Sequence, residues 1–447
     1  MTSQGSIMEA RSETDLLVTP RVPMNPEESY PEKSRVFFGW FALAGVAIVI
    51  FIVGGAFVHS FGVLLPEITA QFGWSRAETS LALTLGILAF GLPSPLFGSL
   101  VNKYGPKYPI IVGNAIAALG LAGVYLAQEV WHLYIFYIIV GFGGGFGGYI
   151  ACTAIVNNWF IRRRSLALGI FQSFSGLGGF VFPPLTTVLI AAIDWRASWL
   201  VLAGLILIIP VFIGGVFLIR NKPEDMGLMP DGMPPDAFLE YEKTQSHFSA
   251  DGDSPEWSGL KVLKTKTPWF IGGFSAANSF TVGTLLSHQI AYLQDIGYTP
   301  MTAATTLSVM SIFSLIGSLG IGFLALRFNI RHLTSIAFIV QIIGLAILLT
   351  TKELGMLYVF TIFLGLSAGS LTVAMAMFIG AYYPRDRYAQ VMGVVFPFQI
   401  ISNAGAATIA GLVFDATSSY TPAFIAAGCF SLAGLFFAHM ARRPKQI

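Results

Sequence analysis

The sequence predicts an all-α membrane protein with twelve transmembrane helices in two pseudo-symmetric six-helix halves. Of its 447 residues, 55% are hydrophobic and 11% are charged, whereas a soluble domain carries about 25% charged residues. Long apolar runs recur along the whole chain, and residues of the first half reappear in the second half at a constant offset. The net charge of +2 gives no sign of nucleic-acid binding.

Twelve apolar runs are long enough to cross a bilayer, since a spanning helix needs about 20 mostly apolar residues. The runs are roughly 38–66, 78–101, 108–127, 131–158, 166–192, 196–219, 268–293, 302–326, 332–351, 354–382, 390–413 and 421–441. They divide the chain into an N-terminal tail, a six-helix half, a linker, a second six-helix half and a short C-terminal tail. The corresponding ranges are 1–36, 37–220, 221–265, 266–441 and 442–447.

The positive charges predict the orientation. If both termini are cytoplasmic, all of the 25 Lys and Arg residues except Arg76, Arg196 and Lys352 fall on the cytoplasmic side. This bias follows the positive-inside rule. It also leaves no Asp, Glu, Lys or Arg deep inside a span.

The two halves repeat with an offset of 224 residues. The pairs are Gly73 with Gly297, Gly98 with Gly322, Arg163 with Arg387, Gly169 with Gly393, and Gly204 with Gly428. Two parallel six-helix halves related by an axis along the membrane normal, with a site between them, are a known transporter plan.

The segment "GSLVNKYGPK", residues 98–107, resembles the loop motif of the major facilitator superfamily, Gly-x-x-x-Asp-Arg-x-Gly-Arg-Arg/Lys. Gly98, Lys103, Gly105 and Lys107 match the motif, whereas Asn102 replaces its aspartate. The resemblance implies the fold of that superfamily and transport by alternating access. The replacement weakens any charge-dependent latch that the aspartate forms in the family.

A narrower resemblance is to monocarboxylate porters and their bacterial relatives, including oxalate/formate antiporters. It rests on "NWFIRRRSLALGIFQSFSG", residues 158–176, and on "VHSFGVLLPEI", residues 58–68. The resemblance places His59 where relatives carry a lysine implicated in proton and substrate binding. It also places Ser314 and Ser318 where relatives carry an aspartate and a substrate-binding arginine, so the usual anion-binding group is missing.

Two histidines inside spans are candidates for substrate binding and proton coupling. His59 is costly to bury unless it faces a cavity or a partner, and an imidazole ordinarily titrates near pH 6.5. His288 shares a polar arc of its helix with Thr284. For each histidine the alternative is a structural hydrogen bond, to a backbone carbonyl or to a neighbouring helix.

The other candidate side chains for substrate binding are neutral, and each could instead tie helices together. They are Tyr149, Gln172, Thr284, Ser314, Ser318, Gln399 and Asn403. A second group lies in the loop motif or at basic helix ends, where a gating role is expected. It comprises Gly98, Asn102, Lys103, Gly105, Lys107, Arg162, Arg163, Arg164, Arg327 and Arg387.

These patterns predict a secondary transporter of a small organic solute. A monocarboxylate-type anion moving with a proton is what the resemblance implies, and a neutral or weakly polar solute is the alternative. A non-transporting membrane sensor is a third hypothesis, which the short tail and linker disfavour. We expect no enzyme activity, cofactor, metal or nucleic-acid partner, and a monomer in the bilayer of a bacterial inner membrane.

Overall fold

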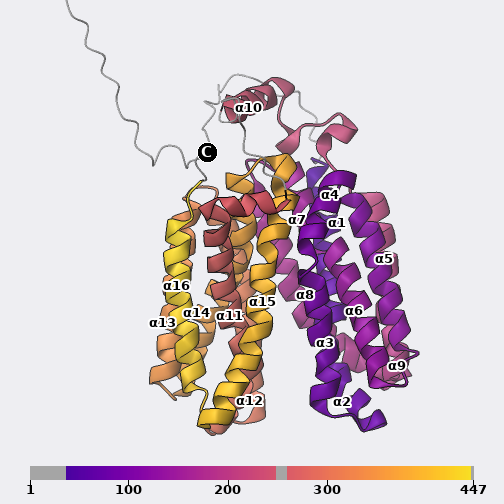
Figure 1. Cartoon of the computed structure of the whole chain (residues 1–447), viewed down its shortest axis with the longest axis vertical. Coiled ribbons are helices and arrows are strands. Elements are labelled where there is room, and N and C mark those ends of the chain that lie inside the picture. Colours follow the sequence, from indigo (N-terminus) through magenta and orange to yellow (C-terminus); the bar gives the residue numbers. More distant parts are fainter. Residues whose placement is uncertain (1–36, 248–258, 444–447) are drawn as a thin grey trace, which may run out of the picture.

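Two helical bundles stand side by side in the computed structural model of the protein, joined at one end by a segment that carries α10 (Pro235–His247) (Figure 1). The structure describes residues 37–247 and 259–443. The tail 1–36, the linker residues 248–258 and the last residues, 444–447, lie outside the described part of the chain. The end that carries α10 is called the linker end below.

The N-terminal bundle contains the first six predicted spans. They are α1 (Gly39–Gly54) with η1 (Gly55–His59) and α2 (Phe61–Phe72); α3 (Arg76–Gly91) with α4 (Ser94–Tyr104); α5 (Lys107–Val124); α6 (Val130–Gly147) with α7 (Tyr149–Trp159); α8 (Arg164–Ile193); and α9 (Trp195–Ile206) with η2 (Leu207–Leu218).

The C-terminal bundle contains the other six predicted spans. They are α11 (Lys266–Asp295), α12 (Pro300–Leu324), α13 (Ile330–Thr350), α14 (Leu354–Tyr382), α15 (Tyr388–Thr417) and α16 (Thr421–Met440). Between the bundles, the described linker residues form η3 (Pro223–Met226), η4 (Pro230–Gly232), α10 and η5 (Gly259–Lys264), and η6 (Arg385–Arg387) precedes α15.

Eleven of the twelve predicted spans are apolar enough to cross a membrane by length and composition. Among the described residues, ten helices pass on their own, and α3 with α4 makes an eleventh if this pair, bent by 45°, is one span. The twelfth, α11, is 30 residues long. Asn278, His288 and Gln289 make it more polar, and it packs between α15 and α16.

The breaks within spans have local causes. Pro93 precedes α4 and cannot donate a backbone hydrogen bond to the turn before it, which bends the second span there. Gly148 separates α6 from α7 with φ −98° and ψ −120°. In the first span, η1 is a π-helical turn, a rare widening of the helix that is frequent at functional sites.

The two bundles meet at two crossings that the 224-residue repeat relates to each other. In one, an ideal Cβ on Gly393 of α15 would lie 2.3 Å from the Ser94 carbonyl oxygen of α4. In the other, an ideal Cβ on Gly169 of α8 would lie 2.6 Å from the Ser318 carbonyl oxygen of α12. Only glycine allows backbones to approach this closely, and small residues serve this purpose in membrane helices.

Candidate functional site

The interface between the bundles is lined by one stripe of α8 and one stripe of α15. On α8, Gly169, Gln172, Gly176 and Gly179 recur every three or four residues and therefore lie on one face. Gly169 faces Ser318 of α12, and a Cβ on Gly176 would lie 3.9 Å from the Leu315 side chain. This face of α8 therefore points toward the C-terminal bundle.

The α15 stripe mirrors the α8 stripe. Gly393 faces Ser94, the Phe396 ring lies against the N-terminal bundle, and the Ile400 side chain reaches Gly91. Asn403 is seven residues after Phe396 and lies on the same face. The repeat relates Gln172 to Phe396, Gly176 to Ile400 and Gly179 to Asn403.

Aromatic rings close the middle of the interface. Tyr149 at the start of α7 stacks on Phe396, with centroids 5.3 Å apart and planes at 18°. Phe90 of α3 lies 6.0 Å from Phe396, and Phe171 of α8 lies 5.9 Å from Tyr149. The Tyr149 hydroxyl and the Gln172 carbonyl oxygen Oε1 are buried without a hydrogen-bond partner. Unsatisfied buried polar atoms of this kind are rare and call for an explanation such as a ligand or water.

His59 ends the π-helical turn of the first span. Its ring packs on α8, where an ideal Cβ on Gly179 would lie 3.0 Å from His59 Cε1. Within residues 37–247 and 259–443, no hydrogen bond to this half-buried ring is found. The turn is held from behind, because Ser60 donates its backbone N–H and its hydroxyl to the Gly55 carbonyl, at 2.9 and 3.1 Å. Thr186 of α8 donates to the Ser60 hydroxyl at 2.8 Å.

Several other predicted binding residues serve as ties between helices of the C-terminal bundle. His288 Nε2 lies 2.9 Å from the Ala407 carbonyl oxygen of α15, and the Ser318 hydroxyl donates to the Ser314 and Gly369 carbonyls at 3.0 and 3.1 Å. Asn403 Nδ2 makes only a long hydrogen bond, 3.4 Å, to the Ser279 carbonyl, and its carbonyl oxygen Oδ1 takes no part in that bond.

The remaining predicted binding residues keep polar atoms free or partly free. The Thr284 hydroxyl is buried without a partner, and Ser314 is half-buried. Gln399 is half-buried and accepts a long hydrogen bond, 3.4 Å, from Ser275.

A buried polar network in the same bundle was not foreseen from the sequence. Gln341 of α13 donates to Asn278 of α11 at 3.1 Å and accepts from Ser431 of α16 at 3.1 Å, and Ser431 meets Thr281 at 3.1 Å. These four side chains come from three predicted spans, with Asn278 and Thr281 three residues apart on α11. An uncharged polar residue in the middle of a span is the sequence signal for such a network, but it does not reveal the partner.

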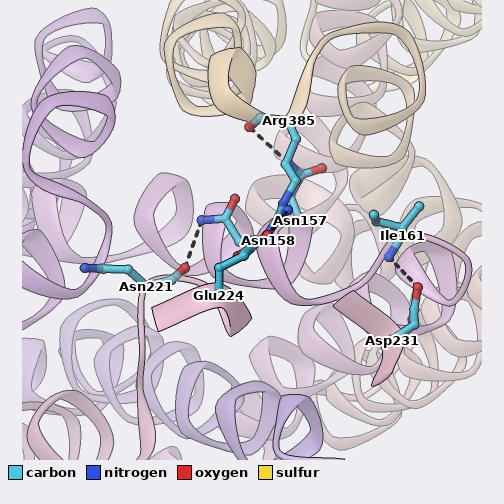
Figure 2. A network of polar contacts seen from close by, with 7 residues as sticks. All are labelled: Asn157, Asn158, Ile161, Asn221, Glu224, Asp231 and Arg385. Atoms are coloured by element: carbon cyan, nitrogen blue, oxygen red, sulfur yellow. Dashed lines mark hydrogen bonds and ion pairs between the residues drawn. The ribbon is translucent and has the colours of Figure 1, made fainter. Parts of the chain in front are cut away.

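The linker end is closed by contacts that connect the linker to both bundles (Figure 2). Arg385 pairs with Glu224 through two hydrogen bonds, Nη1 to Oε1 at 2.7 Å and Nη2 to Oε2 at 3.2 Å. Asp231 accepts from the backbone N–H groups of Ile161 and Arg162, at 2.8 and 2.6 Å. Asn157 donates to the Arg385 carbonyl at 3.4 Å.

The loop motif contributes to this closure through its last residues. Lys107 donates its backbone N–H to Asn221 Oδ1 at 2.8 Å, and a Cβ on Gly105 would lie 2.8 Å from the Asn221 side chain. Asn102 and Lys103 are exposed. Gly98 packs on α15, with an ideal Cβ 2.3 Å from the Ala389 carbonyl oxygen.

The basic residues expected at the gate have different environments. Arg164 donates to the Gly380 carbonyl of α14 and so bridges the two bundles. Arg387 lies 3.2 Å from Asp386, its neighbour in η6. Arg162, Arg163 and Arg327 are exposed at the linker end.

The sequence matches one family model in two overlapping regions, residues 40–350 and 268–447, and that model describes the Major Facilitator Superfamily. The chain belongs to the major facilitator superfamily. This family and the relatives below are transporters, so the protein is a multi-pass membrane transporter and not an enzyme.

Similar members of the superfamily include monocarboxylate transporters. The chain is 27% identical to monocarboxylate transporter 13 of Rattus norvegicus, over 89% of this chain and 87% of that protein. It is 24% identical to monocarboxylate transporter 12 of Homo sapiens, over 92% of this chain and 82% of that protein.

Solved structures of the superfamily have the same fold. The E. coli fucose:proton symporter FucP superposes with a TM-score of 0.69 at 16% identity, over 91% of this chain and all of that one. The proton:xylose symporter XylE superposes with a TM-score of 0.75 at 13% identity, over 91% of this chain and 96% of that one. These likenesses confirm the predicted superfamily fold.

Proposed function

We propose that this transporter carries a small monocarboxylate-type organic anion together with a proton. The two bundles would expose the interface around His59 and Asn403 alternately to either side of the membrane. The observation that carries the proposal is His59, a titratable ring that reaches the interface at a π-helical turn without a hydrogen-bond partner in the described residues.

A protonatable His59 would supply the positive charge that Ser314 and Ser318 do not. No Asp, Glu, Lys or Arg lies in the central part of a span. An anion therefore has no permanent counter-charge there, so its binding would require a proton on His59, and anion and proton would move together. The similar mammalian proteins are monocarboxylate transporters, which supports an anion of this class.

A neutral or weakly polar solute is the second candidate. It is favoured by the same lack of fixed charge and by uncharged polar atoms at the interface, among them the unpartnered Tyr149 hydroxyl and Gln172 Oε1. Such a solute would bind equally well at low and high pH.

Orientation and location belong to the same proposal. The charge distribution favours a linker end that faces the cytoplasm. We further propose a cell-membrane location, a monomeric working unit, and the domain boundaries 37–220 and 266–441 for the two halves.

Ligand-dependent thermal stability of the purified protein tests the proposal. We would compare lactate, benzoate, succinate and xylose at pH 5.5 and 7.5, because a ligand at 100 times its dissociation constant stabilises by about 2.7 kcal/mol. Stabilisation by the monocarboxylates, stronger at pH 5.5, is expected. A response to xylose alone, equal at both pH values, would replace this proposal with the neutral-solute candidate.

Substitution of His59 by Gln tests the role of the ring. H59Q should retain the fold and lose proton-driven accumulation of the anion in proteoliposomes, because Gln cannot carry the proton. Accumulation at the wild-type level would show that another group couples transport to the proton.

A further inference from the structure

The repeat relates two contacts at the interface that the sequence alone does not connect. In the N-terminal bundle, His59 of the first span packs on Gly179 of α8. In the C-terminal bundle, Asn403 of α15 packs on Gly283 of α11, where an ideal Cβ would lie 3.1 Å from Asn403 Nδ2. An offset of 224 residues takes His59 to Gly283 and Gly179 to Asn403.

The two contacts are therefore equivalent helix–helix contacts, one in each half. The polar residue and the glycine have exchanged helices between them. In one half the polar side chain comes from the first helix and the glycine from the fifth. In the other half the polar side chain comes from the fifth helix and the glycine from the first. The pseudo-two-fold axis places both contacts at the same depth, one in each half.

Both side chains lie one helical turn farther from the linker end than a contact between the bundles. On α8, Gly179 follows Gly176, which faces Leu315; on α15, Asn403 follows Ile400, which faces Gly91. These two contacts, and those at Gly169 and Gly393, all lie on the linker side of His59 and Asn403. Both His59 and Asn403 are half-buried rather than sealed.

We propose that His59 and Asn403 act as a pair, one from each half, that holds the polar group of the substrate from two sides. Gly179 and Gly283 are positioning residues, because each leaves the room in which its polar neighbour lies. The inference rests on the proposed function and identifies the contact that replaces the missing span-eight arginine.

Few charged groups compete with His59 for the proton. The helices packed against His59, α1 and α8, carry no titratable side chain near the ring. Arg196 of α9 donates to the Tyr125 and Ala127 carbonyls, and Glu67 of α2 is exposed. Across the interface, α12 has no titratable residue, and His288 of α11 is bonded to Ala407.

An exchange of the two side chains tests the pair. If a protonated His59 is required, the apparent dissociation constant for benzoate should rise from pH 5.5 to pH 7.5, because the protonated fraction of the imidazole falls as the pH rises. H59N should lose this pH dependence. The double variant H59N/N403H should regain it, because the histidine would reach the same substrate group from the other half.

A folded double variant whose benzoate affinity stays as insensitive to pH as that of H59N would overturn the pairing. The glycines give a second readout: G179A and G283A should each weaken benzoate binding, whereas G204A and G428A should leave it unchanged. Gly204 and Gly428 are also related by the repeat, and neither has an atom within 4 Å of an added Cβ. Equal effects of all four substitutions would contradict the positioning role.

Thiol labelling separates failure of the pair from failure of the proposed function. In a variant that lacks Cys152 and Cys429, cysteines at 59 and 403 should both react with a membrane-impermeant thiol reagent from the side opposite the linker end, and a short bifunctional reagent should join them. If benzoate and lactate do not bind but this labelling is seen, the proposed anion is wrong and the pair stands. If only one position is labelled, the pair is wrong, whatever the substrate.

Discussion

The ion pair between Glu224 and Arg385 should hold the linker end closed. It joins the start of the linker, which follows the N-terminal bundle in sequence, to η6, which precedes α15 in the C-terminal bundle. The pair is bidentate, with distances of 2.7 and 3.2 Å, and the two side chains are 29% and 23% exposed. A fully exposed pair contributes about 0.2–1 kcal/mol, and hydrogen bonds to charged groups contribute about 1.5–3 kcal/mol. For this partly buried pair we expect about 1–2 kcal/mol, which changes an equilibrium about 5–30-fold.

The substitution E224Q keeps the shape of the side chain and removes its charge. It should shift the protein by that factor toward states with an open linker end. Pulsed electron paramagnetic resonance between nitroxides at Tyr104 and Phe328 would measure the shift, in a background without Cys152 and Cys429. Both label sites are exposed at the linker end, one in each bundle, and the repeat relates them. We expect a larger population of long distances.

The substitution D386N is the matched control. Asp386 pairs with Arg387 within η6, so this ion pair does not connect the two bundles. It should leave the distance distribution unchanged, whereas the exchange E224R/R385E should restore the parent distribution in part. The reasoning is refuted if E224Q leaves the distances as they are, or if D386N shifts them equally.

Two further predictions concern packing between helices. G393A should abolish transport while the protein still folds. The added Cβ would lie 2.3 Å from the Ser94 carbonyl oxygen and would push the two bundles apart. Solute flux in proteoliposomes measures the loss, and G428A is the control because nothing lies within 4 Å of its added Cβ. Q341L should lower the free energy of unfolding by about 1–3 kcal/mol, because it leaves buried polar partners such as Asn278 unsatisfied. Chemical denaturation measures this loss. Unchanged stability would show that the network contributes little.

The overall arrangement of the spans could be predicted because apolar length and the constant offset are properties of the sequence itself. Two of the breaks within spans were visible in principle, at Pro93 and at the glycine-rich run that contains Gly148. The π-helical turn before His59 was not visible, since a single widened turn leaves the composition of the span unchanged. The structure reveals this π-helical turn and the hydrogen bonds of Ser60 and Thr186 that stabilise it.

The candidate site was predicted only as a set of residue types. The sequence places His288 on a polar arc but cannot distinguish a ligand contact from a tie to α15; the structure has the His288–Ala407 contact. Gln341 and Asn278 are 63 residues apart, and Gln341 and Ser431 are 90 apart, so their network depends on tertiary packing. The exchange of His59 and Asn403 between equivalent contacts likewise requires the geometry of both halves.

The replacement of the motif aspartate by Asn102 acquires a physical meaning from the linker. Asn102 is exposed, but Gly105 and Lys107 of the same loop hold Asn221 at the start of the linker. Three residues later Glu224 reaches Arg385 in the other bundle. The loop that contains Gly105 and Lys107 therefore still helps to close the linker end, because it holds the segment that carries Glu224. An ion pair between the two halves, Glu224 with Arg385, is therefore present at this end although Asn102 at the motif position is uncharged.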